Sequence, residues 1–215
     1  RFTNAKIIAI TGSNGKTTTT FLVAHILEKA GYDVLVAGNI GTGFAKSISE
    51  RDYDYIVLEL SSFQLDGIKD FKADIAILLN ITLDHLDRYE YSFENYIKSK
   101  LQITNNQNEN DVFIYNYDDT NIREKSNTKA KMIPFSLIKE FETDGAFYKN
   151  NKININLNNN EMTIQDLALQ GKHNVYNSMA AAVASRVLEV KDIIIRQSLQ
   201  DFKNIEHRLE HVINI

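Results

Sequence analysis

Short, continuous apolar runs alternate with helix-spaced apolar positions along the first 135 residues of the chain. The continuous runs predict strands at 6–11, 32–37, 55–60, 74–80, 111–115 and 131–135. Between the first two runs, the apolar residues of 16–30 recur at helical spacing, and Gly31 is placed to end that helix. Strands that are apolar throughout and separated by helices predict a parallel sheet covered on both faces.

The pattern changes after residue 135. Residues 145–159 alternate polar and apolar side chains around asparagine-rich turns, which predicts a small antiparallel hairpin region. Residues 174–190 and 192–202 then predict two helices. No internal repeat and no Pro/Gly-rich linker divides the chain. We therefore expect one α/β domain, with a mostly parallel sheet flanked by helices, a small antiparallel hairpin region and a two-helix end.

Composition excludes several classes of protein. The 43% hydrophobic and 24% charged residues are typical of a globular protein, and the net charge of -4 gives no general attraction to nucleic acid or anionic membranes. No apolar run approaches the ~20 residues of a membrane span, and the lack of cysteine excludes disulfides and thiolate zinc sites. We expect a cytoplasmic protein with no nucleic-acid partner and no membrane insertion. The chain lacks an initial Met, and we expect it to be a piece of a longer protein.

A turn of small residues joins the first predicted strand to the first predicted helix. It reads Thr11-Gly12-Ser13-Asn14-Gly15-Lys16-Thr17-Thr18. Such a turn can direct backbone N–H groups and a helix N-terminus at phosphate, with Lys16 as a point charge and the Thr17 hydroxyl on Mg²⁺. Ile10 stands where the longer phosphate-loop pattern has a glycine, so the match is to the shorter Gly-x-x-Gly-Lys-Thr form. A plain Gly/Ser turn is the alternative, but the strand before and the helix after favour a nucleotide-binding sheet of the phosphate-loop type.

Polar residues follow the next apolar runs, where parallel strands bring their carboxyl ends to one edge of a sheet. Asn39 follows the second run, Glu59 ends the third, and residues 84–88, which contain two acids, a histidine and an arginine, follow the fourth. Mg²⁺ prefers oxygen ligands and needs only one or two carboxylates besides phosphate. Glu59 by itself would be read as facing water, but its position one βαβ unit after Lys16 favours a metal ligand. The 84–88 segment is either a polar loop with a capping aspartate or a source of a second metal ligand or substrate clamp.

Other polar residues give weaker signals. Lys100 lies in a helical stretch where a surface lysine is the commoner explanation, and the pattern does not separate it from Lys98. Four further residues fit capping or surface positions equally well, namely Asn174, Asn177, His207 and Arg208.

Six blocks of sequence, taken together, resemble the Mur ligase family. They are residues 11–18, Gly38-Asn39-Ile40-Gly41, Leu58-Glu59-Leu60-Ser61-Ser62-Phe63-Gln64-Leu65, residues 80–88, Gly171-Lys172-His173-Asn174-Val175-Tyr176-Asn177 and His207-Arg208-Leu209-Glu210. Their order and spacing fit the family, and they cover nearly the whole chain. The second and third blocks most resemble the members that join D-glutamate to UDP-N-acetylmuramoyl-L-alanine.

The resemblance implies an ATP and Mg²⁺ site. The ATP-binding loop would consist of Gly12, Ser13, Asn14, Gly15, Lys16, Thr17 and Thr18. The catalytic residues would be Lys16, Glu59, His85 and Lys100. Thr17 and Glu59 would bind one Mg²⁺ and His85 a second. Lys100 matches a lysine that the family carries as a carbamate, which can ligate Mg²⁺ where an ammonium would repel it.

The resemblance also implies contacts with the substrates. Asn39 and Ser61 would contact the muramoyl-alanine part of the acceptor, while Asp87 and Arg88 would lie near phosphate and substrate. The adenine and ribose side would be lined by Asn174, Asn177 and Arg208.

The implied reaction is ATP-dependent amide formation in peptidoglycan synthesis. A substrate carboxylate would attack the γ-phosphate to form an acyl phosphate, which the amine of D-glutamate would then attack. The resemblance covers residues 1–215 as a single central ATPase domain, without the family's uridine-nucleotide and amino-acid domains. We therefore expect this monomeric piece to bind ATP weakly and not to ligate.

Three other interpretations are weaker. A folylpolyglutamate synthase shares the phosphate loop, but the block at 61–65 argues against it. A phosphate-loop NTPase without ligase activity would turn over ATP without an acceptor. A catalytically silent binding domain would need changes at Lys16, Glu59, His85 or Lys100, and none is visible.

Overall fold

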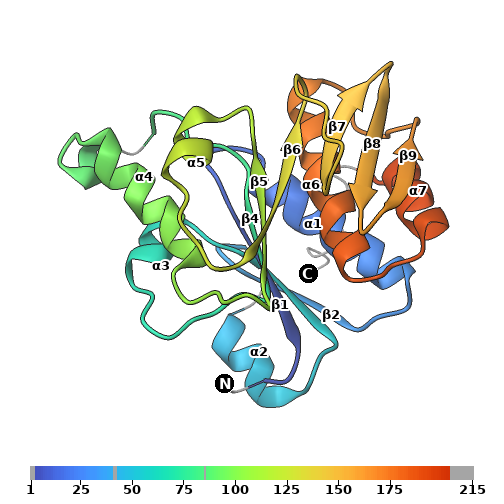
Figure 1. Cartoon of the computed structure of the whole chain (residues 1–215). Helices are drawn as coiled ribbons and strands as arrows, with labels where there is room; N and C mark the ends of the chain where they lie inside the picture. The colour runs from blue at the N-terminus through green and yellow to red at the C-terminus, as the bar shows by residue number, and fades with distance from the viewer. Residues whose placement is uncertain (1–2, 41–42, 85, 204–215) are drawn as a thin grey trace.

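The computed structural model describes residues 3–40, 43–84 and 86–203, and every structural statement below refers to these residues. Their strands form one sheet in the order β2-β3-β1-β4-β5-β6-β7-β8-β9 (Figure 1). The strands are β1 (Lys6–Thr11), β2 (Val34–Gly38), β3 (Tyr55–Glu59), β4 (Ile75–Leu78), β5 (Val112–Asn116), β6 (Lys131–Ser136), β7 (Gly145–Lys149), β8 (Lys152–Leu157) and β9 (Asn160–Ile164). The helices are α1 (Lys16–Lys29), α2 (Phe44–Glu50), α3 (Ser62–Asp66), α4 (Phe93–Leu101), α5 (Thr120–Lys125), α6 (Lys172–Val187) and α7 (Asp192–Asp201), with short 3-10 turns η1 (Leu86–Tyr89) and η2 (Gln102–Thr104).

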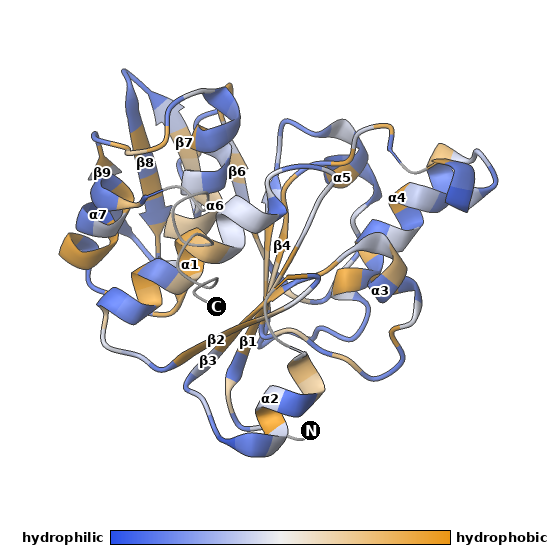
Figure 2. Cartoon of the chain, turned by 180° about the vertical axis from the view of Figure 1, so that it is seen from behind, coloured by the Kyte–Doolittle hydropathy of each residue, from blue (hydrophilic) through white to orange (hydrophobic). Residues whose placement is uncertain are grey.

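Strands β2, β3, β1, β4, β5 and β6 pair in parallel, as the apolar runs predict, and β6 also pairs in parallel with β7, which they did not predict. Alternate residues of β1 point to opposite faces, because successive side chains of a strand do so. Ile8 and Ile10 pack in a core with α1, α6 and α7, whereas Ile7 and Ala9 pack in a second core with α3, α4 and α5. Figure 1 shows these two groups of helices on either side of the sheet, and Figure 2 shows apolar residues along β2 and β4. The mostly parallel, doubly covered sheet is confirmed.

The antiparallel region continues the same sheet. Strand β7 pairs in parallel with β6 and antiparallel with β8, and β8 pairs antiparallel with β9. The region therefore contains a third strand, β9, in addition to the predicted hairpin. Both of its tight turns consist of two asparagines with positive φ, at 150–151 and 158–159. Asparagine tolerates this left-handed conformation better than most residues, and two-residue hairpin turns require it.

No helix within the described ranges is long and apolar enough to cross a membrane.

Candidate active site

The loop between β1 and α1 lies at the carboxyl edge of the sheet and leads directly into the N-terminus of α1. Gly15 precedes the helix with φ 84, in the left-handed region, and no side chain caps the helix there. A Cβ on Gly15 would lie 2.4 Å from Oδ1 of Asn177 on α6. Glycine is required at this position by both its backbone conformation and this close approach. The uncapped first turn leaves N–H groups available to an anion.

Lys16 lies over this loop. Its Nζ donates hydrogen bonds to the carbonyl oxygens of Gly12 and Ser13, both at 2.9 Å. Burial lowers the pKa of Lys16, while the carboxylates of Glu59 and Asp84 act in the opposite direction. The geometry therefore places a half-buried cation beside the N-terminus of α1.

Glu59, at the end of β3, connects the loop to the neighbouring strand. Its carboxylate accepts hydrogen bonds from the Thr17 hydroxyl at 2.7 Å and from Nδ2 of Asn39 at 2.9 Å. The residue is 1% exposed. Gly38 makes this arrangement possible, because with φ 106 its backbone approaches Glu59 so closely that a Cβ would lie 2.2 Å from the Glu59 carbonyl oxygen. Residues predicted from three different strand ends are thus in hydrogen-bond contact.

Lys100 reaches the same place from α4. It is 2% exposed, and its Nζ donates to the Gly12 carbonyl at 3.0 Å and to the Thr11 hydroxyl at 3.3 Å. Burial, and then the charge of Lys16, lower the pKa of Lys100 to about 7. Lys98, two residues earlier, is exposed. The fold therefore separates two lysines that the sequence pattern could not.

Asn174 and Asn177 lie in the first two turns of α6. Asn177 is buried against Gly15, and its Nδ2 donates to Oδ1 of Asn174 at 3.3 Å. Asn174 also donates to the carbonyl of Gln170 at 2.8 Å. The start of α6 therefore adjoins the phosphate loop itself.

The remaining predicted residues lie farther out or outside the described ranges. Ser61 caps α3 through a capping box with Gln64, so its hydroxyl has a local structural role. Asp87 is exposed on η1, and the Arg88 guanidinium lies 5.0 Å from the ring centre of Phe63. His85 and Arg208 lie outside the described residues.

Asn80 also contacts the loop, although no separate role was predicted for it. It follows β4, and its carboxamide bonds both backbone groups of Asn14 in the phosphate loop. Its position as the first polar residue after an apolar run was the available signal, but the partner lies 66 residues away.

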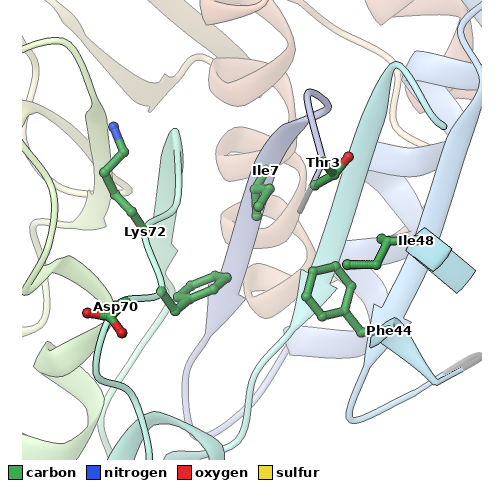
Figure 3. A pocket seen from close by; sticks show the side chains of 7 residues that line it. Thr3, Ile7, Phe44, Ile48, Asp70 and Lys72 are labelled. Atoms are coloured by element: carbon green, nitrogen blue, oxygen red, sulfur yellow. The ribbon is translucent and has the colours of Figure 1, made fainter. Parts of the chain in front are cut away.

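An apolar pocket of about 380 Å³ lies away from these groups, at the amino end of β1 (Figure 3). Ile7, Phe44 and Ile48 contribute apolar side chains, and Thr3, Asp70, Phe71 and Lys72 complete the lining. None of the predicted site residues lines it. The polar cluster at the opposite edge is therefore the candidate site.

The donor set at that edge fits Mg²⁺. Among the described residues, no group of three or more His, Cys, Asp or Glu side chains is placed to hold a metal alone. A buried carboxylate and an adjacent hydroxyl are nevertheless hard oxygen donors, and Mg²⁺ commonly keeps water and substrate phosphate as its other ligands. Glu59 and Thr17 meet that requirement beside the phosphate loop.

The sequence profile of the Mur ligase middle domain matches residues 10–185. The chain belongs to the Mur ligase family. The resemblance noted from the sequence motifs is thereby confirmed.

Curated relatives within the Mur ligase family match over the full chain. The UDP-N-acetylmuramoylalanine–D-glutamate ligase of Christiangramia forsetii is 50% identical over 219 residues, covering 100% of this chain and 49% of the relative. The enzyme of the same name from Bacteroides fragilis is 47% identical over 222 residues, with the same coverage. The chain thus spans about half the length of these relatives.

Solved Mur ligase structures share the fold. A MurF from Acinetobacter baumannii has a TM-score of 0.73 at 24% identity, over 95% of this chain and 48% of that one. The MurF ligase of Thermotoga maritima, solved in complex with ADP, has a TM-score of 0.71 at 20% identity, over 94% and 49%. These likenesses support the architecture described above.

Proposed function

We propose that residues 1–215 are the central ATPase domain of a UDP-N-acetylmuramoylalanine–D-glutamate ligase. The observation that carries this proposal is the cluster of Lys16, Thr17, Asn39 and Glu59 around the N-terminus of α1. The identity of 50% with a relative of that name supports this choice of substrates within the family. ATP, UDP-N-acetylmuramoyl-L-alanine and D-glutamate are the proposed small-molecule substrates. A monomeric state and a cytoplasmic location stay predictions.

The phosphate loop would hold the triphosphate of ATP. The N–H groups of the first turn of α1 would face the phosphate oxygens, and the Lys16 ammonium would neutralise charge on the β- and γ-phosphates. Thr17 and Glu59 would hold Mg²⁺, which offsets the charge that gathers on the transferring phosphoryl group. The hydrogen bond from Asn39 keeps the second carboxylate oxygen of Glu59 oriented.

The proposed reaction has two steps. A carboxylate oxygen of UDP-N-acetylmuramoyl-L-alanine attacks the γ-phosphorus, and the bond from phosphorus to the ADP oxygen breaks. The amine of D-glutamate then attacks the acyl carbon, loses a proton, and inorganic phosphate leaves. Because the chain spans about half of its relatives, we propose that residues 1–215 alone bind ATP without forming product.

Lys100 is the proposed site of a carbamate. Only a neutral amine adds CO₂, and the position of Nζ, buried beside Gly12 and next to the charge of Lys16, favours the neutral form. A carbamate there would place a carboxylate-like group near the phosphate loop, as a ligand for a second Mg²⁺ together with His85. The same proposal includes the predicted substrate contacts of Asn39, Ser61, Asp87, Arg88, Asn174, Asn177 and Arg208.

Substitution of Lys16 in the full-length protein tests the central assignment. Lys16→Ala should abolish ATP-dependent ligation of D-glutamate. The substitution removes the ammonium group that the loop contributes to the proposed phosphate site. Lys46→Ala changes an exposed lysine of α2 and should leave turnover unchanged. Retained ligation in Lys16→Ala would refute the assignment, and preferential use of a folate acceptor would favour the folylpolyglutamate synthase alternative.

Substitution of Lys100 tests the carbamate separately. Lys100→Ala should lose ligation, and short carboxylic acids added to the assay should restore part of it. Lys98→Ala, on the exposed side of the same helix, is the matched control and should retain activity. Full activity of Lys100→Ala without added acid would contradict the proposal.

A further inference from the structure

The segment that leaves β4 runs alongside the phosphate loop. Beyond the end of the strand pairing, Ser13 N–H donates to the Asn80 carbonyl at 2.9 Å. The Thr82 N–H donates to the Ser13 hydroxyl at 2.9 Å, and that hydroxyl oxygen also lies 3.1 Å from the Thr82 carbonyl. The parallel pairing of β1 with β4 therefore extends from the strands into the loop.

The Asn80 side chain completes this contact. Its Oδ1 accepts from the Asn14 N–H at 2.8 Å, and its Nδ2 donates to the Asn14 carbonyl at 3.0 Å. A carboxamide presents one donor and one acceptor in a plane, as a peptide group does. Asn80 thus pairs with the backbone of Asn14 in the way that a neighbouring strand would. Aspartate at this position would keep the acceptor and lose the donor.

The contact between Asn80 and Asn14 lies where the loop turns into α1. Asn14 immediately precedes Gly15, which is in the left-handed region, and Lys16, where α1 begins. Because Asn80 engages both backbone groups of Asn14, the N–H groups left to face an anion are those from Gly15 onward. The Asn14 carbonyl shares a planar peptide group with the Gly15 N–H, so the hydrogen bond from Asn80 Nδ2 orients the first of these N–H groups.

We propose that Asn80 is a positioning residue that orders the phosphate loop before nucleotide binds. A loop that is already in its binding conformation spends less of the nucleotide's binding free energy on ordering. The proposal rests on the proposed function, because it takes the loop as the phosphate site. The Asn80 side chain acts through its hydrogen bonds to the backbone of Asn14, so we assign it a positioning role and not a catalytic one.

The test compares Asn80→Ala with Asn106→Ala in the full-length protein. Asn106 is the matched control, because its Nδ2 also binds loop backbone, the carbonyls of Lys69 and Phe71, both at 2.8 Å, but away from the phosphate loop. Asn80→Ala should raise the KM for ATP at least tenfold and change the KM for UDP-N-acetylmuramoyl-L-alanine less than twofold. Asn106→Ala should leave both constants within twofold. Amide hydrogen exchange of residues 13–18 should accelerate in Asn80→Ala alone.

A second variant keeps the test decisive if Asn80→Ala does not fold. Asn80→Asp has the same size, lacks the donor to the Asn14 carbonyl, and should raise the KM for ATP and the exchange of residues 13–18 in the same direction. The proposal is overturned if a folded Asn80 variant shows an unchanged KM for ATP, or an equal rise for both substrates. Lys16→Ala is measured in parallel. If Lys16→Ala retains ligation, the proposed function itself fails, whereas loss in Lys16→Ala with normal KM in Asn80→Ala rejects only the role of Asn80.

Discussion

The buried amine of Lys100 makes the stability of the fold depend on pH in a way that can be measured. Burial and the charge of Lys16 lower its pKa from 10.5 to about 7. In the unfolded chain a lysine titrates near its ordinary value of about 10.4. Between these two values the unfolded state binds a proton that the folded state does not, so the free energy of unfolding rises with pH. Lys100 therefore destabilises the fold at neutral pH, and this cost disappears towards pH 10.5.

Lys100→Met removes the titrating group and keeps most of the side-chain volume. The lowered pKa corresponds to about 4 kcal/mol of lost unfolding free energy at pH 7 and about 1 kcal/mol at pH 9.5. The variant also loses the hydrogen bonds to Thr11 and Gly12, which costs about 1.5 kcal/mol at either pH. We expect Lys100→Met to be more stable than the original chain by about 2 to 3 kcal/mol at pH 7 and about equally stable at pH 9.5.

Urea unfolding followed by circular dichroism at both pH values measures this difference. The buffers are freed of CO₂ and Mg²⁺, so that a carbamate does not form and change the charge of Lys100. Lys98→Met, with an exposed side chain on the same helix, is the control and should show the same small effect at both pH values. A Lys100→Met variant that is destabilised equally at pH 7 and pH 9.5 would refute the reasoning.

Three further substitutions test local features of the structure. Gly38→Ala should destabilise the protein by at least about 2 kcal/mol in urea unfolding, because it strains a residue with φ 106 and drives a Cβ against the Glu59 backbone. Ser61→Ala removes the cap of α3 and should lower the free energy of unfolding by about 1 kcal/mol. Tyr176→Phe loses the hydrogen bond of 2.7 Å to Asp118 and should lower the free energy of unfolding by about 1–2 kcal/mol. Burial and then Asp118 raise the pKa of Tyr176, so this tyrosine stays protonated at pH 10.5. The substitution should therefore leave the tyrosinate absorbance at pH 10.5 unchanged.

Each of these has an outcome that contradicts it. Gly43→Ala introduces a Cβ with nothing within 4 Å, and equal stability of the Gly38 and Gly43 variants would show that the approach to Glu59 is not restrictive. Unchanged stability of Ser61→Ala would argue against the capping role. A fall in tyrosinate absorbance at pH 10.5 in Tyr176→Phe would contradict the raised pKa.

The sequence predicted the parallel strands well because a strand that is buried on both faces consists of a continuous run of apolar residues. Strand β1 was predicted at the same residues where it lies in the structure. Strand β9 was not anticipated, because only Met162 and Ile164 of its five residues are buried. So short an alternation is a weak signal until the strand pairs with β8.

The candidate site, too, could be predicted from the sequence only in part. The sequence alone determined which strand ends carry Lys16, Asn39 and Glu59, since residue order and strand direction together place them at one edge of the sheet. The pattern of apolar and polar residues could not distinguish Lys100 from Lys98, and only the resemblance to the family did. Residues two apart on a helix point about 200° away from each other. Only the packing of α4 on the sheet decides which one enters the site.

Contacts between distant segments were decided only by the tertiary structure. Asn80 and Asn14 are 66 residues apart, and Asn177 reaches Gly15 from a helix near the other end of the described chain. Nothing in the local pattern of apolar and polar residues specifies such partners, because a polar residue at a strand end is equally compatible with water. The sequence by itself determined the strands from β1 to β6, the position of the turn at 11–18 and the family. The folded chain decided which polar groups hold that loop in place, because hydrogen bonds between segments depend on a relative placement that forms only when both helical layers pack on the sheet.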